Sequence, residues 1–310
     1  MTNQQMNAID QVNLSSDGPN LSRIVAGTMT WGEWGIDYSA SEIADMIGHC
    51  LDLGITSFDH ADIYGHYSTE ASFGHALNKL GTSVRAQMEL ITKCGIRLET
   101  NRRPENRLKS YDLSRDYIIA SAEQSLKNLQ TDYLDLFLLH RPSPLMNPAE
   151  IAEAFTHLEQ SGKVRSFGVS NFTPSQFGLL SQAVTLVTNQ VECHPLHPDC
   201  FYDGTFDQLL AANIRPMVWS PLGGAKYFKG ESTTVLRLRD TVKTLAEKYG
   251  NVGEDVILLA WLLKHPVGAI PVVGTTKKER LTGTRLALDL ELETQDWFAI
   301  LEAAVGHEVA

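Results

Sequence analysis

The sequence predicts an α/β fold: one (β/α)8 TIM barrel with a short N-terminal hairpin and a C-terminal helix. Short apolar runs alternate with longer helical patterns eight times along the chain. These runs are almost continuously apolar, as is typical of strands covered on both faces. Repeated strand–helix units need parallel strands and right-handed crossovers, and eight units fit a closed barrel better than an open sheet. No linker or shift in composition interrupts residues 1–310, so we expect a single domain.

The expected elements follow one another without a gap long enough for another domain. In order, the predicted strands cover residues 23–27, 55–59, 89–93, 134–140, 164–170, 186–192, 215–220 and 269–274. Before them, residues 6–20 predict a hairpin with its turn at Ser16-Asp17-Gly18. After them, TQDWFAILEAA (294–304) predicts the final helix.

Cap residues mark the starts of the predicted helices. Proline at the first helical position strengthens two of them. The predicted caps are Ser39 or Ser41, Ser114, Asn147 before Pro148, and Thr173 before Pro174, and Gly54 is expected to end the first helix. Two polar stretches do not fit the repeat. Residues 97–112 are expected to be a functional or mobile loop, and residues 223–233 a cover over a ligand.

Composition excludes several classes of protein. The net charge of −11 argues against a general binder of nucleic acid or anionic membranes. No run of about 18 apolar residues and no secretory signal is visible, so we expect a cytoplasmic protein. The sequence gives no indication of an obligate protein partner. The segment VECHPLHPDC (residues 191–200) carries two cysteines and two histidines, but prolines interrupt it and the sequence shows no second cluster of ligands. We therefore expect an ordinary loop and no metal.

Four titratable side chains lie at or just after the ends of consecutive predicted strands. They are Asp59, Tyr64, Lys93 and His140. Catalytic groups of such barrels gather at the carboxyl ends of the strands, so these four should meet at one rim. A lysine at the end of an apolar strand needs a carboxylate partner if it is buried, and Asp59 on the neighbouring strand can supply it.

These residue types suit the reduction of a carbonyl group. Hydride arriving at the carbonyl carbon builds negative charge on the oxygen, which needs a proton. A lysine cation about 4 Å from a tyrosine would favour the phenolate, so we expect Lys93 to bring the pKa of Tyr64 down toward working pH. His140 would orient the substrate oxygen against Tyr64.

The motifs FDHADIYG, LITKCG and FLLHRP resemble, in order and spacing, the catalytic tetrad of the aldo-keto reductase family. GVSNF, TNQVE and WSPLGG follow as they do in that family, and the likeness spans about residues 21–290. Among its members the chain looks similar to the YdhF-type bacterial oxidoreductases. The resemblance implies that Asp59, Tyr64, Lys93 and His140 are the tetrad, with Tyr64 as general acid, and that NADPH (NADP+) is the cofactor.

The resemblance also implies which residues contact the cofactor. They are Gly27, Thr28 and Met29 after the first strand; Ser170, Asn171 and Gln190 at the carboxamide; Trp219 stacked on the nicotinamide; Ser220, Leu222 and Gly223 near the pyrophosphate; and Gly274, Thr275, Thr276, Lys277 and Arg280 at the adenosine end. Lys277 and Arg280 favour a 2′-phosphate, hence NADPH. The family usually has Glu-Asn where this chain has Gly283 and Thr284, which leaves the adenine contacts unassigned.

The expected substrate is a small carbonyl compound in contact with Trp31, Tyr64 and His140. His60 follows Asp59 on a strand, so it should point away and pack. Two other functions stay open: a barrel that binds NADP(H) as a sensor with little turnover, and an aldolase that uses Lys93 as a Schiff-base nucleophile. Pairing with Asp59 should keep Lys93 protonated, which opposes the aldolase.

Overall fold

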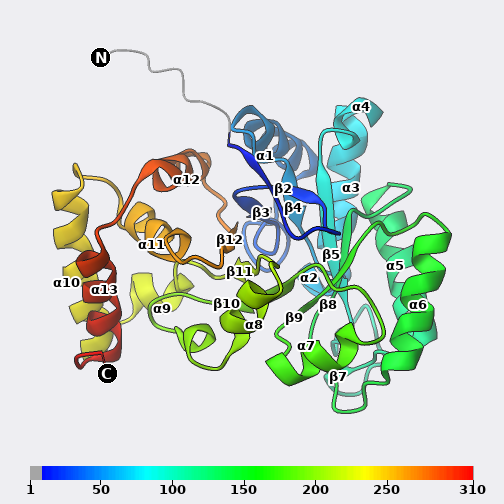
Figure 1. Cartoon of the computed structure of the whole chain (residues 1–310). Coiled ribbons are helices and arrows are strands. Elements are labelled where there is room, and N and C mark those ends of the chain that lie inside the picture. The colour runs from blue at the N-terminus through cyan, green and yellow to red at the C-terminus, as the bar shows by residue number, and fades with distance from the viewer. Residues whose placement is uncertain (1–8, 310) are drawn as a thin grey trace.

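The computed structural model describes residues 9–309 and contains a closed barrel of eight parallel strands, which confirms the predicted fold class (Figure 1). Around the barrel the strands are β3 (Val25–Gly27), β4 (Ser57–Asp59), β5 (Glu89–Cys94), β8 (Leu136–Leu139), β9 (Phe167–Ser170), β10 (Asn189–Glu192), β11 (Met217–Trp219) and β12 (Ile270–Val273). All eight predicted strands are present, each within or within one residue of the predicted range. Nearly all of their residues are buried, which explains why the predicted strands are largely apolar.

Helices surround the barrel and connect its strands (Figure 1). They are α1 (Ala40–Asp52), α2 (Tyr64–Tyr67), α3 (Thr69–Leu80), α4 (Thr82–Arg85), α5 (Arg115–Leu129), α6 (Pro148–Gln160), α7 (Pro174–Ser181), a 3-10 turn η1 (Asp199–Phe201), α8 (Thr205–Ala211), α9 (Gly224–Lys229), α10 (Thr233–Lys248), α11 (Glu254–Leu263), α12 (Lys278–Asp289) and α13 (Thr294–Val305). The last of these is the predicted C-terminal helix, and it packs against α10. Among residues 9–309, no helix is both long and apolar enough to span a membrane.

The predicted helix starts are confirmed, with one difference in detail. Ser39, rather than Ser41, caps α1 in a capping box with Glu42. Thr173 and Asn147 cap their helices with a proline at the first position, as predicted. Ser114 occupies the cap position of α5, but its hydroxyl donates to the carboxylate of Asp112 instead of accepting a helix N–H.

The N-terminal hairpin is present and closes one end of the barrel. Strands β1 (Gln11–Asn13) and β2 (Asn20–Ser22) pair antiparallel, and residues 6–8 of the predicted hairpin lie outside the described residues. Leu14 and Leu21, next to the turn, belong to the same buried cluster as inward-facing strand residues such as Val25 and Met217. The hairpin therefore covers the barrel interior at the end opposite the strands' carboxyl ends.

The polar stretch 97–112 is more ordered than the sequence indicated. Strands β6 (Ile96–Arg97) and β7 (Ser110–Tyr111) pair antiparallel, which turns most of the stretch into a hairpin beyond β5. Arg97 holds the hairpin together by donating to Asn106 and Asp112. The hairpin thus stands at the rim where the strands end.

Candidate active site

A cavity of about 1070 Å³ opens at the carboxyl ends of the barrel strands. Most of the residues predicted from the sequence line it, although they come from separate parts of the chain. These are Gly27, Met29, Asp59, Tyr64, His140, Ser170, Asn171, Gln190, Trp219, Ser220, Leu222, Gly274, Thr275 and Arg280. The barrel therefore gathers the predicted catalytic and cofactor positions around one space.

Lys93 does not line this cavity itself but is fully buried behind the lining residues Asp59 and Tyr64. Its Nζ donates to Oδ2 of Asp59 at 2.6 Å, to the carbonyl of His60 at 2.7 Å and to the phenol of Tyr64 at 3.2 Å. Burial alone would lower the pKa of Lys93, but Asp59 and Tyr64 outweigh it and raise that pKa above its ordinary value. Lys93 is therefore a cation held in one position by three acceptors.

Tyr64 reaches the cavity because the chain turns sharply after β4. The backbone of Gly65 has φ +56°, and a Cβ there would lie 2.6 Å from the hydroxyl of Thr69 and 2.8 Å from that of Ser68. Glycine is therefore required next to the catalytic candidate, both for the left-handed backbone and for space. The turn directs the Tyr64 ring toward Lys93 and His140.

The expected low pKa of Tyr64 is wrong. Burial raises the pKa of the phenol, and the cation of Lys93 offsets only part of that rise, while Asp59 adds to it. Loss of solvent around the ring, which the sequence does not reveal, outweighs the effect of the lysine. Tyr64 consequently keeps its proton at neutral pH, which is the form a proton donor requires.

His140 lies beside Tyr64, with the ring centroids 6.0 Å apart and the planes at 83°. Burial lowers the pKa of His140 well below its ordinary value, and the cations Lys93, Arg141 and Lys109 add to this effect. The imidazole is therefore neutral. Its buried Nδ1 has no hydrogen-bond partner among the described residues. Lys93, not His140, makes the hydrogen bond to the phenol.

The predicted carboxamide residues form a hydrogen-bonded chain along one wall. Trp219 Nε1 donates to Asn171 Oδ1 at 3.0 Å, and Asn171 Nδ2 donates to the hydroxyl of Ser170 at 2.7 Å. Gln190 Nε2 donates to the free carboxylate oxygen of Asp59 at 2.9 Å. The chain therefore links the wall to the Lys93 network and fixes the indole of Trp219 at the cavity edge.

Four predicted cofactor residues do not line the cavity. The hydroxyl of Thr28 is buried and hydrogen bonds the carbonyl of Asp59 and the ring of His60. Gly223 occupies the cap position of α9 and lies close to His194. A Cβ at this position would lie 3.3 Å from the His194 ring. Thr276 and Lys277 lie beyond the cavity edge, where the carbonyl of Thr276 accepts from the hydroxyl of Tyr38 and Lys277 occupies the cap position before α12. Arg280 is the one cation of the GTTKKER motif that lines the cavity.

The expected role of Trp31 in substrate binding is not supported, because its side chain is 1% exposed and lies in the core. It stacks on Phe73, and its Nε1 donates to the carbonyl of Thr275. Trp34, three residues later, lines the cavity and packs against Tyr64. Both tryptophans follow the first strand in the sequence, which does not indicate which of them turns inward.

Other lining residues were not named individually from the sequence. They include Lys109 of the β6–β7 hairpin, Arg141 after His140, Phe228 of α9 and Asp255 of α11. Arg141 directly follows a predicted catalytic residue, and Lys109 lies in the stretch 97–112 that was expected to be functional or mobile, whereas nothing in the sequence indicated Asp255. The helix α9 that carries Phe228 lies within the stretch predicted to cover a ligand, and its residues line the cavity.

Two further predictions concern residues near the site. His60 packs edge-on against Phe73 behind the cavity floor, as expected, and burial lowers its pKa to about 3. In the segment VECHPLHPDC, Cys200 donates to the carbonyl of Glu192 and His194 pairs with the Glu192 carboxylate. Within residues 9–309, no three His, Cys, Asp or Glu side chains gather as metal ligands.

Comparison with known proteins agrees with this geometry. The sequence model of the Aldo/keto reductase family matches residues 23–304. The oxidoreductase YdhF of Escherichia coli strain K12 is 46% identical over 97% of this chain and 99% of its own length. A 6-dehydroglucose reductase of Agrobacterium fabrum is 40% identical over 95% of this chain and 98% of its own length.

Solved structures show the same fold. The glycerol dehydrogenase of Gluconobacter oxydans superposes with a TM-score of 0.82 at 23% identity, covering 96% of each chain. The family and the names of the relatives support an oxidoreductase that acts on carbonyl compounds with a nicotinamide cofactor. The chain, as its sequence motifs indicated, belongs to the aldo/keto reductase family.

Proposed function

We propose that this protein reduces aldehydes or ketones to alcohols with NADPH, and that Tyr64 donates the proton. One observation carries the proposal. The phenol of Tyr64 lies 3.2 Å from the ammonium of Lys93, which is itself held at 2.6 Å by Asp59. This set lies at one end of a cavity that continues past Trp219 to Arg280.

The chain's residues suit each part of the reaction. A reduced nicotinamide, if bound beside these residues, would supply the hydride that the carbonyl carbon takes up. The O–H bond of Tyr64 then breaks, and its proton passes to the substrate oxygen. Lys93 stabilises the phenolate that remains, and Asp59 keeps Lys93 charged. Neutral His140 is suited to donate a hydrogen bond to the same substrate oxygen as negative charge develops there.

The lining of the cavity fits an extended dinucleotide. Amide and hydroxyl groups near Lys93 suit a carboxamide, since both donate and accept hydrogen bonds. Trp219 offers an aromatic face beside them. At the other end, Arg280 is the charged group suited to a 2′-phosphate, so NADPH is proposed over NADH. This preference depends on Arg280 alone, because Lys277 does not line the cavity.

The substrate end of the cavity favours oxygen-rich carbonyl compounds. Lys109 and Arg141 line it beside His140, and Trp34 forms an apolar wall. Cations and an aromatic face suit hydroxylated substrates, which present both polar and apolar edges. Two relatives are named 6-dehydroglucose reductases, at 40% and 35% identity. We propose small polar aldehydes as the substrates to test first.

The two alternatives are less well supported. A Schiff-base aldolase needs a neutral amine, whereas Asp59 and Tyr64 raise the pKa of Lys93. A sensor barrel would share the same cavity, so turnover is the property that separates it from an enzyme.

The test uses the variant Tyr64→Phe, which removes one oxygen. We expect the rate of aldehyde reduction to fall by a factor of about 10² to 10⁴, the usual contribution of a general acid. NADPH affinity, measured by quenching of protein fluorescence, should change less than about twofold, since the phenol contributes a proton and no cofactor contact. Equal loss of rate and of affinity would contradict the role of Tyr64. Absence of turnover in the native protein, with NADPH bound tightly, would favour the sensor.

A further inference from the structure

The adenosine end of the cavity contains a carboxylate that the proposed function leaves unused. Asp255 lies in the first turn of α11 and lines the cavity together with Arg280 of α12. Two carboxylates line this cavity within the described residues, and Asp59 is already bound by Lys93 and Gln190. Asp255 Oδ1 accepts the N–H of adjacent Val256, and the described residues provide no cation within ion-pair distance of it.

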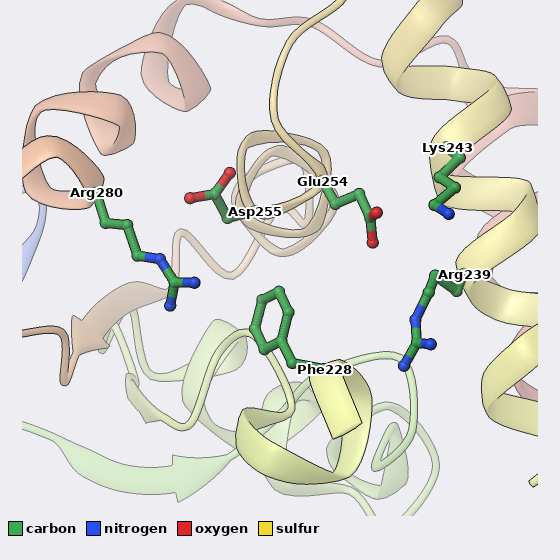
Figure 2. A pocket seen from close by; sticks show the side chains of 6 residues that line it. All are labelled: Phe228, Arg239, Lys243, Glu254, Asp255 and Arg280. Atoms are coloured by element: carbon green, nitrogen blue, oxygen red, sulfur yellow. The ribbon is translucent and has the colours of Figure 1, made fainter. Parts of the chain in front are cut away.

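Figure 2 shows how this end is built. Asp255 and Arg280 point into the same space from two helices, and the ring of Phe228 from α9 lies below them. These three side chains line both the large cavity and a neighbouring pocket of about 350 Å³. Phe228 is 38% exposed, and the guanidinium of Arg280 lies 5.4 Å from its ring centroid. The junction therefore combines a flat apolar surface, one cation and one carboxylate.

A carboxylate can only accept hydrogen bonds, so it needs a donor on the ligand. The phosphates of a dinucleotide carry none and would be repelled by Asp255. The exocyclic amino group of adenine is a donor at the edge of a flat ring, and such a ring can lie against Phe228. Gly283 has no side chain, and the hydroxyl of Thr284 is buried and donates to the carbonyl of Leu281. Gly283 therefore offers the amino group no acceptor, and the Thr284 hydroxyl is already hydrogen-bonded to Leu281.

We infer that Asp255 recognises the adenine base by accepting a hydrogen bond from its 6-amino group, while Phe228 supports the ring and Arg280 holds the 2′-phosphate. This inference rests on the proposed function. It assigns the two opposite charges at this end to two different parts of the cofactor. Asp255 thereby becomes a specificity-determining residue for the base, and Arg280 one for the phosphate.

The test compares NADPH with its hypoxanthine analogue, which has a carbonyl acceptor in place of the amino donor. Dissociation constants are measured without substrate, by quenching of the fluorescence of Trp34 and Trp219 at the cavity. The native protein should bind NADPH about 10- to 100-fold more tightly, the usual effect of a hydrogen bond to a charged group. Asp255→Ala should weaken NADPH and reduce this ratio to nearly one. Asp255→Asn should also give a ratio near one with both ligands bound, because an amide can accept from adenine or donate to hypoxanthine.

The matched control is Glu254→Gln, which removes the same charge from the same helix turn. Glu254 accepts from the hydroxyl of Tyr227 and points away from Arg280 in Figure 2, so the ratio should stay as in the native protein. Equal binding of the two nucleotides by the native protein would overturn the inference and leave the proposed function intact. If Asp255→Ala weakened the binding of NADPH and of its hypoxanthine analogue equally, the inference would be overturned in favour of a contact to ribose. The same would hold if the affinity of Asp255→Ala were reduced for NADH alone. Absence of binding by any dinucleotide would overturn the proposed function and the inference together.

Discussion

The two ends of the cavity are built in opposite ways. At the catalytic end, Asp59 and Lys93 are at most 2% exposed and are connected by hydrogen bonds of 2.6 to 3.2 Å that include Tyr64 and Gln190. At the adenosine end, Arg280 is exposed, and its guanidinium lies over the ring of Phe228. One end is a closed network, and the other is an open arrangement of separate side chains.

The difference reflects what each end has to do. Proton transfer requires that the positions of donor and acceptor be fixed to within a fraction of an ångström, and a buried network of charges enforces this. Binding and release of a nucleotide need an accessible entrance, where a charge stays solvated until the ligand arrives. Substitutions at the catalytic end should therefore alter stability and chemistry together, whereas substitutions at the adenosine end should alter affinity alone.

The largest effect is expected from breaking the buried pair. Lys93→Met leaves Asp59 without its cation, and removal of one partner from a buried pair costs about 3 to 5 kcal/mol of the free energy of unfolding. Urea unfolding at neutral pH measures this loss. The double variant Asp59→Asn with Lys93→Met removes both charges and should recover part of the stability. A double variant no more stable than Lys93→Met would show that the pair is not what the network depends on.

An intermediate effect is expected at the open end. Arg280→Ala removes the one charge suited to the 2′-phosphate, so the dissociation constant of NADPH should rise about 10- to 100-fold and that of NADH less than about threefold. The stability of the protein should stay unchanged because the side chain is exposed. The NADPH effect should shrink as salt is added, since exposed charges are screened. Equal weakening of both cofactors would remove the 2′-phosphate argument.

The smallest effect concerns His60, behind the catalytic end. Its pKa in the folded protein is about 3, against an ordinary value of 6.5. The unfolded chain therefore takes up a proton below about pH 6.5 that the folded protein refuses until about pH 3. The free energy of unfolding should thus decrease as pH falls, by up to about 1.4 kcal/mol per pH unit from this histidine. Thermal unfolding at pH 6.5 and 5.0 should show a smaller decrease in His60→Gln than in the native protein, and an identical decrease in both would refute the assignment.

Local sequence determined the framework of this protein. Most barrel strands lie within largely apolar runs, so their positions along the chain could be predicted, and the carboxyl ends of parallel strands had to bring Asp59, Lys93 and His140 to one rim. Capping residues such as Ser39 and Thr173 fixed helix starts through bonds to neighbours three residues away. These features could be predicted because their causes lie within a few residues of one another.

Tertiary structure alone decided the features whose causes lie far apart in the chain. Gln190 and Asp59 are separated by 131 positions yet share a hydrogen bond. Which tryptophan turns into the cavity depends on how the loop after β3 packs against residues near Thr275. The raised pKa of Tyr64 comes from solvent displaced by every element around it, which no local pattern records. Asp255 and Arg280 line the same pocket only because helices α11 and α12 pack against each other. Distance in space, rather than distance in sequence, sets these properties, and the chain must fold before they exist.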